Sequence, residues 1–303
     1  MLNLYLLNVF RFMKYFITIS VLLFFVSCGS NTTVKEADII TVSIPPFKYF
    51  VEKIGGDDYQ VNIMVPAGAN PHIYEPFPEQ ISKLRKSIAY ISNGYLGFEM
   101  TWLDRFYETN KMMSRLNLGN NIVLLDSDHH HEGEHVEGAD PHYWVSPVCA
   151  YIMAGSIKDF LIELNPENKQ MYEANYQSLV SEIKQLDDRA RGLFASVNSK
   201  SFMIYHPNLG YLARDYGLEE VTVEYEGKEP PPSRMKELID FARNEELKTI
   251  FIQREYDSKN AQAIADEIGA DLVIIDPLSE DWYKSTEDMI IALYNSLNQP
   301  SKL

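Results

Sequence analysis

The spacing of apolar residues divides most of the chain into short strand-like segments that alternate with helix-like ones. In the first half, runs of apolar residues with the length of strands occupy 39–44, 61–65, 89–92 and 122–125. Segments with helical spacing occupy 46–54, 78–86 and 97–108. Strands that alternate with helices in this way build parallel βαβ units, so this half is predicted to form an α/β lobe.

A single long helix is predicted next, over residues 165–196. Asn165 and Pro166 have the side chains expected at the N-cap and first position of a helix, and one glycine and no proline follow up to Ser196. At 1.5 Å per residue, this helix would extend for roughly 40 Å, enough to run along two lobes.

The strand and helix rhythm then returns. Predicted strands occupy 202–205, 221–224, 249–253 and 272–275, and predicted helices occupy 209–216, 233–245, 258–268 and 286–297. The predicted fold class is therefore α/β: two βα lobes with mainly parallel sheets, at 39–164 and 197–303, joined by one long α-helix.

The first residues carry an export signal rather than part of the fold. Basic Arg11 and Lys14 precede an apolar stretch at 15–26 that is short for a membrane span, and Ser27-Cys28-Gly29 follows it. This order resembles a bacterial lipobox, with 1–27 as signal peptide, Cys28 as the lipidated residue and 28–38 as a tether. A plain secretory peptide is the alternative, and Met13 is an alternative start to Met1. Either way the protein is expected to be exported, and with Cys28 lipidated it would be anchored at a bacterial membrane.

Composition narrows the classes of partner. The chain has 43 acidic and 27 basic residues among 303, and its formal charge is -16. Such a surface repels phosphates, so nucleic acid is not expected as a partner. With Cys28 lipidated, Cys149 is the only other cysteine, and we expect it to be a small core residue that forms no disulfide.

Three histidines and one aspartate follow predicted strands in both lobes. His72 and His142 lie in loops of the first lobe, and His206 and Asp276 directly follow strands of the second. Ligands of open α/β sheets bind outside the carboxyl ends of the strands, so these groups are expected to meet in the cleft between the lobes. Imidazole and carboxylate donors in this ratio suit a tetrahedral Zn²⁺ site. Glu280 is the alternative to Asp276 as the acidic ligand. A water molecule in place of either acid is a further alternative.

At these residues the sequence resembles a known family. The motifs are Gly-Ala-Asn-Pro-His-Ile-Tyr-Glu-Pro at 68–76, Asp-Pro-His-Tyr-Trp-Val-Ser-Pro at 140–147, His-Pro-Asn-Leu-Gly-Tyr at 206–211, Glu-Gly-Lys-Glu-Pro at 226–230 and Asp-Pro-Leu at 276–278. In kind and order, the motifs at 68–76, 140–147 and 206–211 resemble the three metal-ligand motifs of the cluster A-I solute-binding proteins, which serve zinc and manganese ABC importers. Asp276 lies where that family places a final acidic ligand, and 226–230 resembles a recurrent loop of its second lobe.

This resemblance implies a monomeric binding protein, not an enzyme, that passes its ion to an ABC permease with its ATPase. It also implies two lobes with limited hinge motion. Histidine in the third motif, at His206, implies zinc, because manganese members commonly carry glutamate there.

Two alternatives stay open beside this interpretation. One is a manganese or iron protein of the same family. The other is a zinc-dependent hydrolase, although HExxH, GxSxG and glycine-rich phosphate motifs are missing from the sequence.

A histidine-rich segment lies between the first and second motifs. It contains His129, His130, His131 and His135, and is either a weak metal-collecting loop or a solvated charged one.

Overall fold

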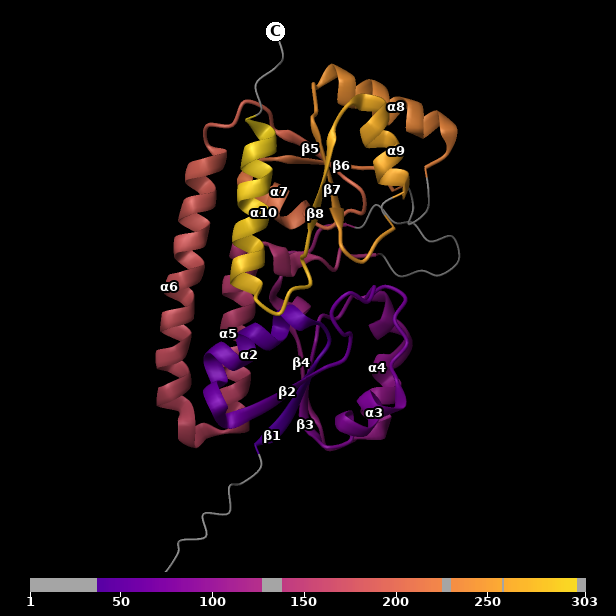
Figure 1. Ribbon diagram of the computed structural model, residues 1–303. Coiled ribbons are helices and arrows are strands. Elements are labelled where there is room, and N and C mark those ends of the chain that lie inside the picture. The colour runs from indigo at the N-terminus through magenta and orange to yellow at the C-terminus, as the bar shows by residue number, and fades with distance from the viewer. Residues whose placement is uncertain (1–36, 127–137, 225–229, 258, 299–303) are drawn as a thin grey trace, which may run out of the picture. The chain divides into compact units, whose positions relative to one another are not determined.

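Two four-stranded parallel sheets form the framework of the protein. The computed structural model describes residues 37–126, 138–224, 230–257 and 259–298. The strand order is β2-β1-β3-β4 in the first sheet and β6-β5-β7-β8 in the second, and every strand pair is parallel. Both lobes thus have the same topology, and the predicted α/β fold class is confirmed (Figure 1).

In the first lobe, each strand is short and most of its buried side chains are apolar. Its strands are β1 (Asp38–Val42), β2 (Tyr59–Ile63), β3 (Ser87–Ser92) and β4 (Ser114–Asn117). Its helices are α2 (Pro45–Gly55), α3 (Pro78–Leu84), α4 (Gly97–Thr109) and α5 (Pro147–Leu164). Prolines begin α2, α3 and α5, where a missing N–H costs no helical hydrogen bond.

The second lobe repeats the pattern after the linking helix. Its strands are β5 (Ser201–Ile204), β6 (Glu219–Thr222), β7 (Thr249–Gln253) and β8 (Asp271–Ile275). Its helices are α7 (Gly210–Tyr216), α8 (Pro232–Asn244), α9 (Lys259–Ile268) and α10 (Trp282–Leu297). Asp281 caps α10 by accepting a hydrogen bond from the backbone N–H of Lys284 at 3.1 Å.

The long helix is present as predicted, with one interruption at its start. A 3-10 turn at Pro166–Asn168 precedes α6 (Lys169–Phe194). This helix packs against α2 and α5 of the first lobe and α10 of the second, as Figure 1 shows. The lobe boundaries at 39–164, 165–196 and 197–303 stay predictions.

The predicted strand at 122–125 is wrong. The fourth strand is β4, whose sequence Ser-Arg-Leu-Asn has one apolar residue. It lies at the edge of its sheet and pairs only with β3, so it does not need a continuous apolar run. Residues 122–125 instead follow a 3-10 turn and contact the second lobe. The Leu125 N–H donates to the hydroxyl of Tyr211 in α7 at 3.1 Å.

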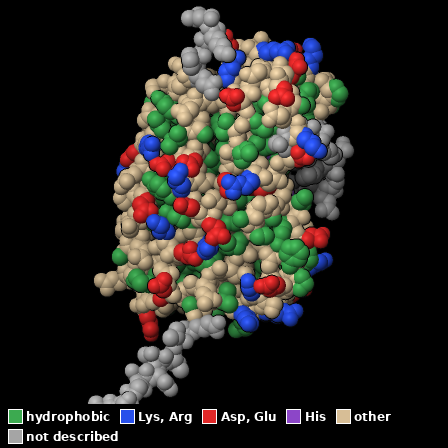
Figure 2. Space-filling view, viewed as in Figure 1, with side chains coloured by type: hydrophobic (Ala, Val, Ile, Leu, Met, Phe, Trp, Pro, Cys, Tyr) green, Lys and Arg blue, Asp and Glu red, His purple; other side chains and the backbone are tan. Residues whose placement is uncertain are grey.

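Acidic and basic side chains are interspersed over the face drawn in Figure 2. None of the helices within the described ranges is both long enough and apolar enough to cross a membrane.

Candidate metal centre

Three histidines from both lobes converge on one point. The Nε2 atom of His72 lies 3.1 Å from Nε2 of His142 and 3.2 Å from Nε2 of His206. One ligand nitrogen from each residue falls within 4.8 Å of the other two. Two nitrogens bound to the same tetrahedral zinc would lie about 3.4 Å apart, because each Zn–N bond is about 2.0–2.1 Å. The triad is therefore close to the size that such an ion needs.

His142 is fixed by the aspartate two residues before it. One carboxylate oxygen of Asp140 accepts from the backbone N–H of His142 at 2.8 Å and pairs with its Nδ1 at 2.7 Å. A carboxylate can only accept, so Nδ1 carries the proton and Nε2 presents its lone pair to the centre. His142 does not follow a strand, contrary to the prediction, but precedes a 3-10 turn at Tyr143–Val145.

His206 is held in the same manner from within the second lobe. It emerges just beyond β5, and its Nδ1 lies 2.5 Å from a carboxylate oxygen of Glu224, which follows the neighbouring strand β6. The ring of Tyr256 stacks on the imidazole, with centroids 4.7 Å apart and planes 20° from parallel. His142 and His206 are both buried, so their orientations are set by these contacts and not by water.

His72 is positioned through its backbone. The Asn70 side chain accepts from the His72 N–H at 2.9 Å, and the start of α4 supports the same loop through a Phe98 N–H bond to the Pro71 carbonyl at 3.2 Å. Gly97 leaves room for this approach, because a Cβ there would clash with the His72 carbonyl oxygen.

A cavity of about 550 Å³ adjoins the triad on the His142 side. Its lining includes the carboxylates of Asp126, Asp140, Glu219, Glu220 and Glu237. Negative charge along such a space raises the local concentration of cations.

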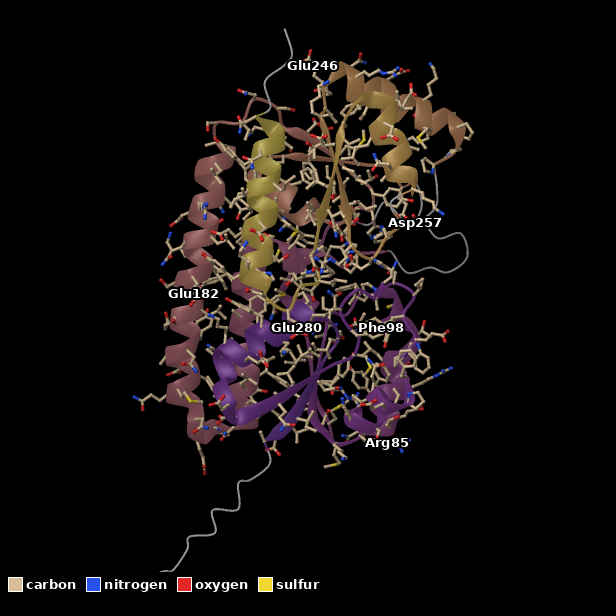
Figure 3. All side chains as sticks on the ribbon, viewed as in Figure 1. Arg85, Phe98, Glu182, Glu246, Asp257 and Glu280 are labelled. Atoms are coloured by element: carbon tan, nitrogen blue, oxygen red, sulfur yellow. The ribbon has the colours of Figure 1, made fainter. Side chains whose placement is uncertain are left out.

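The two predicted acidic ligands each have a cationic partner. Asp276 follows β8 as expected, and its carboxylate lies 3.0 Å from the Arg254 guanidinium. Glu280 forms an ion pair with Lys48 of α2 and lies near the start of α10 in Figure 3. Among the described residues, the three histidines are the only group of three or more whose ligand atoms all lie within 4.8 Å of one another, so the assignment of an acidic ligand stays a prediction.

Sequence reasoning missed most of the residues that support the triad. Asp140 stands in a recognised motif, and its position two residues before His142 was an available signal. Glu224 and the segment 254–256 follow strands whose neighbours in the sheet cannot be read from the sequence. The predicted features at Cys28, His129, His130, His131 and His135 lie outside the described residues.

A buried glutamate supports the His142 segment from inside the first lobe. The Glu99 carboxylate accepts from the N–H groups of Asn93 at 2.8 Å and Gly94 at 2.5 Å, and from the Ser43 hydroxyl. Asn93 in turn donates from its amide to the Pro141 carbonyl at 2.9 Å. Burial raises the pKa of Glu99 to about 7, although these hydrogen bonds lower it in part.

We expect Glu99 to make stability depend on pH. Its folded-state pKa of about 7 exceeds the ordinary 4.5, so its contribution is fully present below pH 4.5 and is lost as pH rises through 7. Relative to Glu99→Gln, the wild type should lose on the order of 3 kcal/mol of unfolding free energy between pH 4 and 8. Urea titrations of both metal-free proteins across this range measure the difference. A difference that does not change with pH would contradict the assignment.

Both lobes of the chain match known zinc-uptake proteins. The family model of the zinc-uptake complex component A, periplasmic (ZnuA) matches residues 40–297. The zinc-binding lipoprotein AdcA of Streptococcus pneumoniae is 28% identical to this chain over 91% of its residues. AdcA is longer, and the match covers 57% of its length. The high-affinity zinc uptake system protein ZnuA of Bacillus subtilis is 27% identical, over 94% of this chain and 93% of its own length.

A solved structure has the same architecture. A crystal structure of a ZnuA deletion mutant with zinc bound is 35% identical, with a TM-score of 0.81 over 88% of this chain and all of that one. Together with the family match over both lobes, this likeness decides the classification. The chain belongs to the ZnuA family of periplasmic zinc-uptake components.

Proposed function

We propose that this chain is the exported, metal-binding component of an ABC importer, and that Zn²⁺ is its cargo. The observation that carries the proposal is the convergence of three Nε2 atoms from two lobes at 3.1–3.2 Å. The Nδ1 atoms of His142 and His206 pair with carboxylates, which leaves the Nε2 atoms of these two rings as lone-pair donors. Three imidazoles suit zinc better than manganese, which prefers oxygen donors.

Several finer features belong to this proposal. Cys28 is the proposed site of lipidation, which would keep the protein at a bacterial membrane, on its periplasmic or cell-surface side. Its partners would be an ABC permease and the associated ATPase, and the ion would be delivered rather than used for hydrolysis. The names of the AdcA and ZnuA relatives support this interpretation. The histidine-rich segment 129–135 is proposed as a weaker metal-collecting loop.

Metal analysis of the purified protein tests the proposal. Elemental analysis should find one tightly bound zinc per chain, and a chelator competition should show that zinc binds more tightly than manganese by orders of magnitude. Equal or stronger binding of manganese would contradict zinc as the cargo. Absence of any tight divalent ion would contradict the proposal as a whole.

A further inference from the structure

The segment that follows β7 forms a wall of the metal centre. In the second sheet β7 lies between β5 and β8, and all three strands are parallel. His206 follows β5 and Asp276 follows β8, so the residues after β7 emerge between them at the same edge. Asp257, labelled in Figure 3, marks the end of this segment.

Contacts on both sides fix the position of Glu255 within this segment. Before it, Arg254 pairs with Asp276 at 3.0 Å. After it, Tyr256 stacks on His206 and is hydrogen-bonded to the side chain of Asn70 from the first lobe. Glu255 is thereby held between the ends of β5 and β8.

The Glu255 carboxylate has an unused acceptor at this position. Its Oε2 atom is buried and has no hydrogen-bond partner within the described parts of the chain. The carboxylate interacts electrostatically with both His142 and Asp276. Leaving a buried oxygen without a partner is unfavourable, and a bound cation would remove that cost.

We propose that Glu255 supplies the oxygen ligand that completes the shell formed by His72, His142 and His206. This inference rests on the proposed function. Asp276 and Glu280 already have cationic partners, whereas one oxygen of Glu255 has no hydrogen-bond partner among the described residues. Since Glu255 is not within 4.8 Å of all three histidines, its side chain turns toward them when the ion binds. Three nitrogens and one carboxylate oxygen then give a closed tetrahedral zinc site.

Three isosteric substitutions separate the candidate carboxylates. Glu255→Gln, Asp276→Asn and Glu280→Gln are each titrated with zinc against a chelator. Glu255→Gln should weaken binding by about 100-fold or more, beyond the 10–100-fold range of residues that only support a ligand, whereas the other two should change it by less than about 10-fold. The absorption spectrum of bound Co²⁺ should change with Glu255→Gln alone, because only that variant alters the ligand set.

The stability of the metal-free proteins separates a ligand from a structural residue. Glu255→Gln removes a buried charge, so its thermal midpoint without metal should equal or exceed that of the wild type. A lower midpoint accompanied by weaker binding would assign a structural role and overturn the proposal. Affinity within about 10-fold of wild type would also overturn it, while leaving the three-histidine site and the proposed function intact. Failure of the wild type to bind zinc would instead reject the proposed function.

Discussion

Replacing His206 with alanine should lower the affinity for zinc by at least about 100-fold. The imidazole supplies one of three nitrogens that already lie at nearly the spacing of a zinc shell, and no other described histidine could take its place. His72→Ala and His142→Ala should cause losses of the same order, because each removes an equivalent donor. Competition titration with a chromophoric chelator measures all three.

Two control variants sharpen this test. His135→Ala removes a histidine outside the triad and should leave the tight site within about threefold of wild type, since a single loop ligand contributes only to weak binding. Glu224→Gln keeps the His206 ring but removes its carboxylate partner, so a loss of about 10–100-fold is expected. If any of the three triad variants bound zinc as tightly as the wild type, that histidine would not be a ligand.

A strand with apolar side chains on both faces, such as β3, could be predicted from its residues alone. β3, at the centre of its sheet, is covered on both sides and reads as an apolar run. β4 lies at the edge and includes exposed Arg115, so neither its pattern nor its composition indicated a strand. The run at 122–125 has the apolar composition of a strand, but Val123 is exposed and the Leu125 N–H donates to Tyr211 of α7, a contact that only the tertiary structure specifies.

The site was predictable to the extent that its residues stand in motifs. His72, His142 and His206 each lie beside a proline in a recognisable stretch, and the structure brings them together. Arg254, Glu255 and Tyr256 have no such signature. Their nearness to His206 and Asp276 follows from the order β5-β7-β8, in which β5 and β7 are adjacent in space but separated in the sequence by β6 and two helices. Strand order in a parallel sheet depends on helix crossovers, which local patterns do not encode.

Two buried tryptophans link the two lobes. Trp144, two residues after His142, donates from its indole N–H to the Pro277 carbonyl at 2.9 Å. Trp282, the first residue of α10, donates to the Trp144 carbonyl at 2.6 Å. Both side chains are 1% exposed, and Trp282 also packs against Phe50 with ring centroids 4.9 Å apart. This pair therefore connects the end of β8 to the segment that carries His142.

Replacing Trp282 with alanine should lower the free energy of unfolding by about 3–5 kcal/mol, because it leaves a large cavity and an unpaired carbonyl at Trp144. Trp102→Ala, which truncates a half-buried tryptophan of α4, should cost distinctly less. Denaturant titrations of the metal-free proteins measure both losses. A loss below about 1 kcal/mol for Trp282→Ala would show that the interlobe contact contributes little to stability.

The same titrations with zinc present distinguish packing from binding. Zinc stabilises the folded state by RT ln(1 + [Zn]/Kd), so the added stability reports the affinity that each variant retains. Trp282 is not a predicted ligand, yet its indole N–H holds the backbone of Trp144, two residues after His142. If the lobes are held in register by this contact, zinc should stabilise Trp282→Ala by less than the wild type at the same free zinc concentration. Equal stabilisation would mean that the triad assembles without the tryptophan pair.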